Sequence, residues 1–473
     1  DLIMEILHVS AECYPVAKVG GLGDVAGALP KYQQKNGHSV KLIMPMYKTK
    51  FLLDNEWEVD YKGSANLGDY FFDFTIIREK TDKLGFSLYL VDINGLLDRE
   101  RVYGYQDDAQ RFTAFQISVA SWLRQWETKP HVVHCHDYHT GLLPFLFKYC
   151  YDFKALQYVP TVLTIHNAEY QGWMTWDKSV WLPRYDSWKA GLLEWGKVIN
   201  PLASGIKNAW AVTTVSPSYM EELRYNSNGL EALFEYEKGK CHGILNGIDN
   251  EVWNPKTDSF LEHNFDVTHL TNGKQQNKIA LCSEFGLNTA YPLFIFIGRL
   301  VGEKAADILP DAIRAAFYSL NKKVNFLILG SGEPSIEQGL DALKQEFKGN
   351  YNFYKGYNEK LSHLMYAGAD FLLMPSRVEP CGLNQMYALR YGTMPLVRRI
   401  GGLKDTVIDI GDHGYGICFS NANINDLVDS CHRAVAVFDN KKNLASYRKK
   451  MMQIDNSWEN TVGKYIQLYE QLN

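Results

Sequence analysis

The sequence predicts an α/β protein with two Rossmann-like domains, each a parallel β-sheet covered by helices on both faces. Three observations support this fold class. The chain has 473 residues, more than one hydrophobic core normally serves. Short β-branched runs alternate with helical patterns in the first half, and the alternation starts again in the second half. Apolar residues make up 46% of the chain and charged residues 22%, as is typical of a globular protein.

The predicted strands fall into two groups. The first group is EILHVS (5–10), SVKLIMP (39–45), FSLYLVD (86–92), HVVHCHD (131–137), PTVLTIH (160–166) and AWAVTTVS (209–216), with a helical pattern over 109–126. The second group is 292–300, 325–332, 352–357, 370–376 and 395–403. The polar segment 254–277 has little periodicity, so we place the crossing between the domains there. The predicted domains are therefore residues 1–253 and 254–453.

Composition excludes several classes of protein. The net charge of −5 provides no general surface for polyanions, so no nucleic-acid partner is expected. The longest apolar stretches are far shorter than the roughly 20 residues that a membrane span needs, and the first residues lack the pattern of a signal peptide. Eight cysteines without a CxxC pair suit a reducing compartment. We expect a cytoplasmic protein.

A glycine-rich motif, KVGGLGDVAGALP (18–30), follows the first predicted strand. It differs from a dinucleotide-binding fingerprint in its GxGxxxG spacing and in the seven-residue loop before Lys18. The next strand also ends in Pro45, Met46 and Tyr47, without the acidic residue that binds ribose. We interpret Lys18 as a cation for an anionic leaving group, assisted by backbone amides at a helix N-terminus. The alternative is a structural glycine turn.

The matching loop of the second domain, IGRLVGEKAAD (297–307), carries two cations just past a strand. Ligands of such folds bind at the carboxyl ends of the strands, so we expect this loop and the Lys18 loop to face one deep interdomain cleft. Arg299 and Lys304 could then clamp a diphosphate from the opposite side. The alternative is a pair of ordinary surface charges.

Four of the thirteen histidines lie in HVVHCHDYH (131–139), which raises the possibility of zinc. Strand alternation places His134 and His136 on one face, but no complementary cysteine or acidic cluster is visible. Histidines of the core or of the cleft lining are therefore favoured. Asp137, at the end of this strand, and His166, at the end of the next, are candidate site residues at the cleft edge.

A third loop, PSRVEPCGLNQMYALRYG (375–392), follows a strand and opens a helix. Glu379 lies at the turn, and the amides of Gly382 and Leu383 could point toward an anion; the alternative is a solvated carboxylate. The sequence contains no DxD motif to hold a metal on a nucleotide diphosphate, no GxxxxGK[ST] loop and no GxSxG elbow. These absences disfavour metal-dependent sugar transfer, P-loop ATPases and serine hydrolases.

Several motifs occur in order from residue 5 to about residue 470. They are KVGGLGDVAGALP, HCHDYHTGLLP, TIHNAEYQG, TTVSPSYMEEL, GILNGIDNEVWNP, IGRLVGEKAAD, PSRVEPCGLNQMYALRYGTMPLVRRIGGLKDTV and SWENTVGKYIQLY. Together they resemble the bacterial glycogen synthase and starch synthase family. The resemblance implies a GT-B fold and a retaining, metal-independent transfer of glucose from ADP-glucose to the non-reducing end of an α-1,4-glucan. It also implies that the C-terminal helix, 454–473, packs back on the first domain, with a hinge near residue 450.

The resemblance also implies roles for individual residues. The implied catalytic residues are Lys18, Asp137, His166, Arg299, Lys304 and Glu379, and the implied substrate-binding residues are Gly20, Gly21, Asn246, Tyr357, Cys381, Gly382 and Leu383. The first glycines would contact the diphosphate and donor sugar, Asp137 and His166 would line the sugar pocket, and Glu379 would approach the glucose. Tyr357 would stack on adenine, and Asn246 would lie on the acceptor side.

Three positions depart from the family pattern. Val19 replaces the threonine of the common KTGGL motif, and Tyr387 stands where the wider GT-B class often has a second glutamate. Ala305 replaces a glycine that commonly follows the lysine, and we expect only a small adjustment of the helix start there. Tyr387 removes the second carboxylate expected to contact ribose.

Three rival functions remain to be compared. One is a glycosyltransferase that uses UDP-glucose or another acceptor, and another is a catalytically silent glucan-binding protein. The charged candidates of the cleft are all present, which disfavours the silent protein. A nicotinamide oxidoreductase is disfavoured by the glycine spacing and the missing ribose-binding acid.

Overall fold

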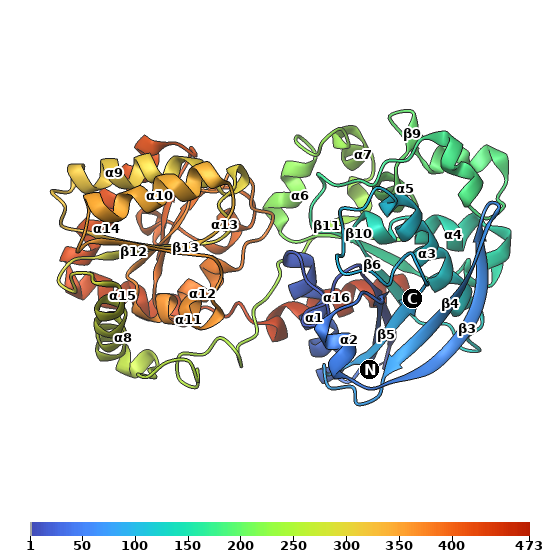
Figure 1. Cartoon of the computed structure of the whole chain (residues 1–473), viewed down its shortest axis with the longest axis horizontal. Helices are drawn as coiled ribbons and strands as arrows, with labels where there is room; N and C mark the ends of the chain where they lie inside the picture. The colour runs from blue at the N-terminus through green and yellow to red at the C-terminus, as the bar shows by residue number, and fades with distance from the viewer. Residues whose placement is uncertain (1) are drawn as a thin grey trace. The chain divides into compact units, whose positions relative to one another are not determined.

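The computed structural model describes residues 2–473, which divide into two compact units (Figure 1). Unit 1 comprises the chain up to Leu245 together with Thr461–Asn473, and unit 2 comprises Asn246–Asn460. The division therefore precedes the polar segment 254–277 that the sequence suggested as the crossing. Trp253, Leu261 and Phe265 are buried in an apolar cluster of unit 2, which ties this segment to that unit. Both units are α/β, as predicted.

Unit 1 is built on a nine-stranded sheet with the order β11-β10-β7-β6-β1-β2-β5-β4-β3. Its strands are β1 (Glu5–Val9), β2 (Ser39–Pro45), β3 (Trp57–Leu67), β4 (Tyr70–Glu79), β5 (Ser87–Asp92), β6 (Val132–His136), β7 (Thr161–Ile165), β10 (Ala211–Thr214) and β11 (Cys241–Gly243). All six predicted runs form strands here, and the pairings from β11 to β5 are parallel. A short separate hairpin joins β8 (Glu194–Trp195) to β9 (Val198–Ile199).

One edge of this sheet was not predicted. Strands β3 and β4 form an antiparallel hairpin, and β4 pairs antiparallel with β5, so the sheet is mixed rather than wholly parallel. The hairpin turns at Gly68 and Asp69, where Gly68 has a φ of +60° that favours glycine. β3 alternates between exposed and partly buried residues, because one of its faces meets solvent.

The helices of unit 1 connect these strands. They are α1 (Gly21–Lys35), α2 (Lys50–Asp54), α3 (Asp108–Arg124), α4 (Leu143–Tyr149), α5 (Pro201–Asn208), α6 (Pro217–Leu223) and α7 (Glu231–Tyr236). The C-terminal helix α16 (Trp458–Leu472) begins in unit 2 and continues into unit 1, where Tyr465 and Tyr469 are fully buried. None of the helices within residues 2–473 has the length and apolar character that crossing a bilayer requires.

Unit 2 is built on a six-stranded parallel sheet with the order β14-β13-β12-β15-β16-β17. Its strands are β12 (Leu293–Ile297), β13 (Asn325–Gly330), β14 (Tyr351–Lys355), β15 (Phe371–Met374), β16 (Met394–Arg398) and β17 (Ile417–Phe419). Its helices are α8 (Leu270–Phe285), α9 (Leu309–Ser319), α10 (Pro334–Glu346), α11 (Glu359–Gly368), α12 (Asn384–Arg390), α13 (Gly401–Thr406), α14 (Ile424–Asp439) and α15 (Lys441–Met452). The five runs predicted for this half are confirmed as strands, and β17 is an addition.

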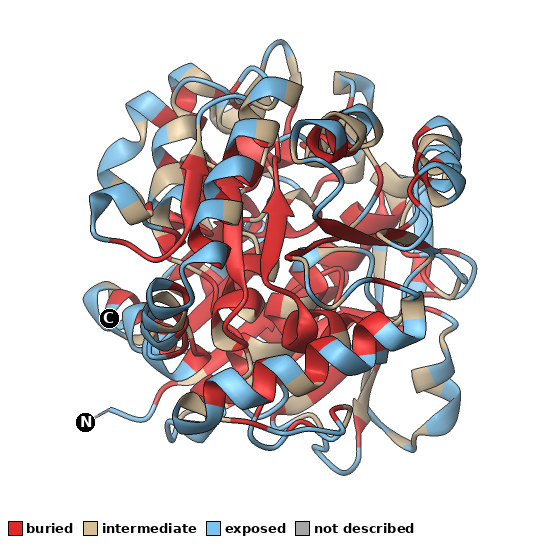
Figure 2. Ribbon diagram, turned by 90° about the vertical axis from the view of Figure 1, so that its left-hand side faces the viewer, coloured by how far each residue is buried: buried red, intermediate tan, exposed pale blue. Residues whose placement is uncertain are grey.

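Apolar side chains cover the unit 2 sheet on both faces. Alternate residues of β12 separate into two clusters, because Phe294 packs in one cluster and Leu293 and Ile295 in the other. Figure 2 shows the result: strands are buried, and helices beside them carry a buried and an exposed face. Chemistry-bearing side chains are therefore found mainly in the loops, and parallel strands direct those loops to one edge of each sheet.

A buried ion cluster joins the helices of unit 2 to its sheet. Asp370, just before β15, accepts hydrogen bonds from Lys278 of α8 (2.8 Å), Arg448 of α15 (2.6 Å) and the Leu293 amide (2.8 Å). Burial by itself would raise the pKa of Asp370, but the two cations hold it below its usual value. All three side chains are buried, so loss of the carboxylate would leave two cations without their counter-ion.

We expect Asp370→Asn to lower the free energy of unfolding of unit 2 by about 3–5 kcal/mol, because breaking a buried ion pair leaves an uncompensated charge. Chemical denaturation followed by tryptophan fluorescence measures this loss. Asp311→Asn is the matched control, since Asp311 forms an exposed pair with Arg314 at 3.5 Å and should lose less than about 1 kcal/mol. Equal losses in the two variants would contradict the assignment.

Candidate functional site

The loop after β1 folds around a buried carboxylate. Glu12 Oε1 accepts hydrogen bonds from the amides of Val19 (2.6 Å) and Gly20 (3.0 Å), and its Oε2 accepts one from the Tyr103 hydroxyl (2.6 Å). The Gly20 amide, which the sequence suggested for donor binding, is therefore engaged by Glu12 in this structure. No local signal revealed Glu12, because its partners come from the glycine motif and from Tyr103, far along the chain.

The glycines of this loop serve two purposes. A Cβ at Gly23 would lie 2.9 Å from Lys18 Cγ, and one at Gly27 would lie 2.5 Å from the Tyr14 carbonyl oxygen, so packing requires glycine at both positions. A Cβ at Gly20 or Gly21 would meet no heavy atom of the described chain within 4 Å. These two glycines therefore border open space at the N-terminus of α1, where a ligand can approach the backbone.

Lys18 is half-exposed beside this open space. Its Nζ lies 2.9 Å from Asp24 Oδ1, in the first turn of α1. Val19, which replaces the threonine of the common motif, has 61% of its surface exposed. A ligand anion at the helix N-terminus would therefore meet a lysine that is already positioned by Asp24.

The structure brings Asp137 and His166 together at the ends of β6 and β7. Asp137 Oδ1 accepts the His166 amide at 2.7 Å, and the carboxylate also accepts the Asn167 amide. Asp137 has a φ of +60°, which is rare for a residue other than glycine and marks a strained backbone. Burial raises the pKa of this carboxyl to about 7, against the effect of the two amides.

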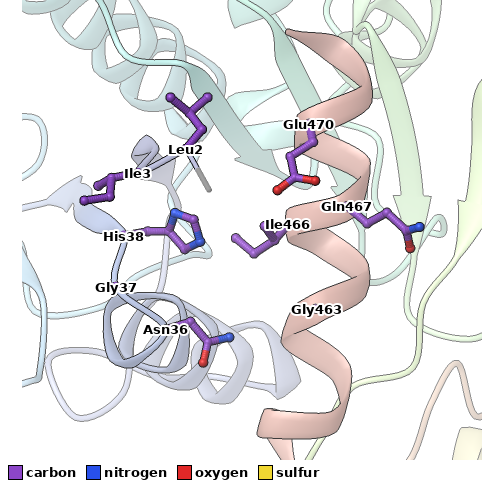
Figure 3. A pocket seen from close by; sticks show the side chains of 9 residues that line it. All are labelled: Leu2, Ile3, Asn36, Gly37, His38, Gly463, Ile466, Gln467 and Glu470. Atoms are coloured by element: carbon purple, nitrogen blue, oxygen red, sulfur yellow. The ribbon is translucent and has the colours of Figure 1, made fainter.

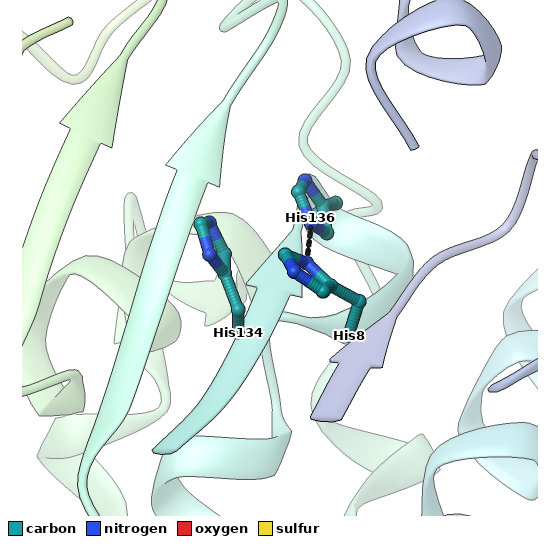
Figure 4. A group of neighbouring side chains, drawn as sticks. All are labelled: His8, His134 and His136. Carbon is teal, nitrogen blue, oxygen red and sulfur yellow. Dashed lines mark hydrogen bonds between the residues drawn. The ribbon is translucent and has the colours of Figure 1, made fainter. Parts of the chain in front are cut away.

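A cluster of three histidine rings, His8, His134 and His136, adjoins this site through the contact of His136 with His166 (Figure 4 shows the cluster). Nitrogen atoms of His8, His134 and His136 lie within 4.8 Å of one another, close enough for three metal ligands. Each of their six ring nitrogens already has a hydrogen-bond partner in the protein. The rings are fully buried, and burial lowers the pKa of His8 to about 4. This arrangement supports the interpretation of His134 and His136 as core residues.

In unit 2, the loops after β12 and β15 meet through an ion pair. Lys304 Nζ lies 2.8 Å from both oxygens of Glu379, and the Ser376 hydroxyl donates to Glu379 Oε2 at 2.9 Å. Glu379 is buried, while a quarter of the Lys304 side chain is exposed. Arg299 extends from the same loop into solvent and lies 3.4 Å from Glu303. Lys304 and Glu379 are thus in contact with each other, whereas Arg299 pairs with a neighbour in its own loop.

Ala305 adopts a left-handed conformation with φ +55°, which favours glycine. A short 3-10 turn, Gly302–Lys304, ends at this residue, and α9 begins only at Leu309. Ala305 also precedes a second 3-10 turn, Ala306–Ile308, which leads directly into α9, so the left-handed residue lies between two turns where this helical segment starts. The left-handed residue directs the chain so that Lys304 faces Glu379.

The loop of Cys381, Gly382 and Leu383 is held by close packing against α13. A Cβ at Gly402 would lie 2.1 Å from the Cys381 carbonyl oxygen, and one at Gly401 would lie 2.0 Å from that of Glu379. Gly382 has a φ of +77°, and Leu383 precedes α12 directly. Asn246 is buried beside Cys381, whose thiol interacts with its backbone amide. Among residues 2–473 the Asn246 Oδ1 atom finds no hydrogen-bond partner.

Two aromatic residues of unit 2 have different surroundings. Tyr357 follows β14, 71% of its surface is exposed, and its hydroxyl donates a hydrogen bond to Glu359. Tyr387, which replaces the second glutamate of the wider class, stacks on Trp253 with ring centroids 3.9 Å apart. Its ring also packs edge-on against Tyr366. Tyr387 therefore has a packing role in place of a carboxylate.

A cavity of about 450 Å³ lies elsewhere in unit 1 (Figure 3). It is lined by residues of the N-terminal segment, of the loop between α1 and β2 and of α16, among them His38, Ile466 and Glu470. Residues Leu2 and Ile3 precede β1, and His38 precedes β2, so the cavity lies at the amino ends of these strands. It is thus at the opposite end of the sheet from Lys18, Asp137 and His166.

Comparisons with known proteins agree with this arrangement. Residues 5–236 match the family model of the starch synthase catalytic domain, and residues 280–451 match that of the glycosyl transferases group 1. The chain is 51% identical to a glycogen synthase of Flavobacterium johnsoniae, with 98% of each chain covered. It is 36% identical to a glycogen synthase of Lactococcus lactis, with 99% of this chain and 100% of the relative covered.

Two solved structures also match this chain over nearly its whole length. The catalytic domain of starch synthase IV from Arabidopsis thaliana, bound to ADP and acarbose, matches with a TM-score of 0.87 and 32% identity, covering 100% of this chain and 99% of that one. A sucrose-phosphate synthase from Thermosynechococcus elongatus matches with a TM-score of 0.65 and 16% identity over 99% of both chains, which is a likeness of fold alone.

We expect Asp137→Asn to gain stability relative to the wild type as pH rises from about 4 to about 7. The folded protein holds the Asp137 proton up to about pH 7, whereas the unfolded chain releases it near pH 4. The contribution of the Asp137 carboxyl to the free energy of unfolding is therefore complete below about pH 4 and is lost as pH rises to about 7, whereas an asparagine side chain does not titrate. Melting temperatures of both proteins between pH 4 and pH 8 measure the difference. A difference that does not grow with pH would contradict the buried, protonated carboxyl.

Proposed function

The chain belongs to the glycogen synthase and starch synthase family of glycosyltransferases, and on this basis we propose that it transfers glucose from ADP-glucose to the non-reducing end of an α-1,4-glucan. The similarity to a glycogen synthase over 98% of both chains carries the proposal. The starch synthase of similar structure binds ADP and acarbose, an oligosaccharide analogue, which supports an adenine nucleotide donor and a glucan acceptor. Glycogen, starch and maltooligosaccharides are the acceptors we propose.

The proposed chemistry depends on stabilising the leaving group. Breaking the bond between glucose and the diphosphate places negative charge on the diphosphate, and Arg299 and Lys304 would hold it, with Lys18 contributing from unit 1. Lys304 pairs with Glu379 in the structure, so the diphosphate would take over a cation that is already positioned. Glu379 would keep the Ser376 hydroxyl as a partner and turn its other oxygen toward the glucose.

The environment of Asp137 supports front-face attack with retention. A covalent mechanism needs a free carboxylate beneath the anomeric carbon. Asp137 is buried, and its carboxylate already accepts the backbone amides of His166 and Asn167, so it is not free in this sense. We propose instead that the departing phosphate accepts the proton of the acceptor hydroxyl. Asp137 would hold the backbone of His166, and His166 would bind the transferred glucose.

The remaining assignments follow the same proposal. Tyr357 would stack on adenine, since its ring is exposed at the end of β14. Gly20, Gly21 and the amides of the Cys381–Leu383 loop would contact the donor, and Asn246 would lie on the acceptor side. We propose that no metal takes part, because the sequence has no DxD motif to hold one on a diphosphate.

We expect label from ADP-[14C]glucose to enter glycogen, with undiminished turnover in EDTA. Incubation with labelled ADP-glucose or UDP-glucose, followed by precipitation of the polymer, measures the transfer. Faster incorporation from UDP-glucose than from ADP-glucose would show that the proposed donor is wrong. Binding of glycogen without incorporation from either donor would favour a silent glucan-binding protein. Inhibition by EDTA that added Mg²⁺ reverses would contradict metal independence.

We expect Lys304→Ala to lower kcat by roughly 10²-fold or more, because removal of a comparable oxyanion donor has that effect. Steady-state kinetics with ADP-glucose and glycogen measure the loss. Lys355→Ala is the matched control, since Lys355 is an exposed cation at the end of β14, 3.7 Å from Glu337, and its removal should leave kcat unchanged. Full activity of Lys304→Ala would refute the diphosphate-binding role.

A further inference from the structure

A chain of hydrogen bonds leads from α1 through the core of unit 1 to His166. Gln33 Oε1 of α1 lies 2.7 Å from His8 Nε2, and His8 Nδ1 lies 3.0 Å from His136 Nε2, the step drawn in Figure 4. His136 Nδ1 in turn lies 3.0 Å from His166 Nε2. Three rings from β1, β6 and the end of β7 are thus joined in one line.

The three rings are uncharged at neutral pH. Burial lowers the pKa of His8 to about 4 and that of His166 to about 3, and it holds the pKa of His136 well below the usual value. A neutral imidazole carries one N–H donor and one acceptor nitrogen. Each hydrogen bond between the rings therefore determines which nitrogen of the next ring holds the proton.

The amide of Gln33 sets the direction of the line. Its carbonyl oxygen can only accept, so His8 donates from Nε2 and presents Nδ1 as an acceptor. His136 must then donate from Nε2, and its Nδ1 becomes an acceptor for His166. His166 consequently donates from Nε2, and its Nδ1 is left with a lone pair.

We propose that Gln33, acting through His8 and His136, sets the tautomer of His166 so that Nδ1 accepts a hydrogen bond from a hydroxyl group of the donor sugar. Gln33 is then a positioning residue, deep in the core and remote in sequence from the residue that it controls. The identity of the sugar rests on the proposed function, whereas the tautomer depends on the hydrogen bonds alone.

A second branch holds the Gln33 amide in place. Gln33 Nε2 donates to the Tyr469 hydroxyl of α16 at 3.0 Å, and this hydroxyl lies 2.5 Å from His134 Nδ1. The branch continues from His134 Nε2 to the Thr164 hydroxyl at 2.5 Å, and from there to Thr213 at 2.6 Å. The hydroxyl groups of this branch can rotate to suit their neighbours, so it accommodates the direction that Gln33 imposes.

The first test uses the unaltered full-length protein. Long-range ¹H–¹⁵N spectra of protein labelled with ¹⁵N-histidine distinguish protonated from unprotonated ring nitrogens, and the signals of His166 are those that disappear in His166→Asn. We expect His166 to show a protonated Nε2 and an unprotonated Nδ1. Protonation of Nδ1 instead would overturn the proposal without any variant of the core.

The second test removes the acceptor. Gln33→Met keeps the volume of the side chain but cannot accept from His8, so we expect a mixture of His166 tautomers and a kcat lowered by roughly tenfold, the equivalent of one hydrogen bond. Thr213→Val is the matched control, because it removes a buried hydroxyl from the other branch and should change neither the His166 spectrum nor kcat. An unchanged His166 spectrum in Gln33→Met would overturn the role of Gln33.

The two proposals fail in different ways. A wild-type protein with the expected tautomer but no transfer of labelled glucose would overturn the proposed function and, with it, the sugar contact. A wild-type protein that transfers glucose while His166 carries its proton on Nδ1 would overturn only the tautomer proposal. A kcat for Gln33→Met equal to that of the wild type, with an altered spectrum, would overturn the contact between Nδ1 and the sugar.

Discussion

Both units depend on the same constraint: their central strands run parallel and are buried on both faces. Unit 2 buries the Asp370 ion cluster, but the charged residues predicted for the site lie in loops, and parallel strands direct those loops to one edge of each sheet. In unit 1 the neighbours β7, β6 and β1 bring His166, Asp137 and the glycine loop to one edge of the sheet. In unit 2 the neighbours β12 and β15 do the same for Lys304 and Glu379.

The loops at these edges are organised by internal hydrogen bonds and ion pairs. Glu12 holds two amides of the glycine loop, Asp24 holds Lys18, and Glu379 holds Lys304. In each case the acidic residue binds a group that, in the proposed reaction, would contact the diphosphate or the sugar. A bound substrate would therefore exchange one partner for another, which requires less reorganisation than desolvating a free charge.

Close backbone contacts maintain the loop of unit 2. The carbonyl groups of Glu379 and Cys381 lie too close to Gly401 and Gly402 for either glycine to carry a side chain. The start of α13 therefore packs directly against the Glu379 turn. Ala305 accepts a left-handed conformation at the end of the Lys304 turn, where glycine would be less strained. The two ends of the Lys304–Glu379 pair are thus positioned by backbone geometry as well as by charge.

Local patterns in the sequence were sufficient to identify most strands, the two-domain α/β class and the loops that carry Lys18, Asp137, His166, Lys304 and Glu379. They were sufficient because buried strands and the glycine turn have signatures within a few residues. The β3–β4 hairpin has a turn signal at Gly68 and Asp69, but its strands are not among the predicted runs. The tertiary structure alone decided that Glu12 engages the Gly20 amide, that Lys304 pairs with Glu379, 75 residues away, and that Gln33 is linked to His166. These contacts depend on the order of strands in each sheet, which brings together residues that no local pattern relates.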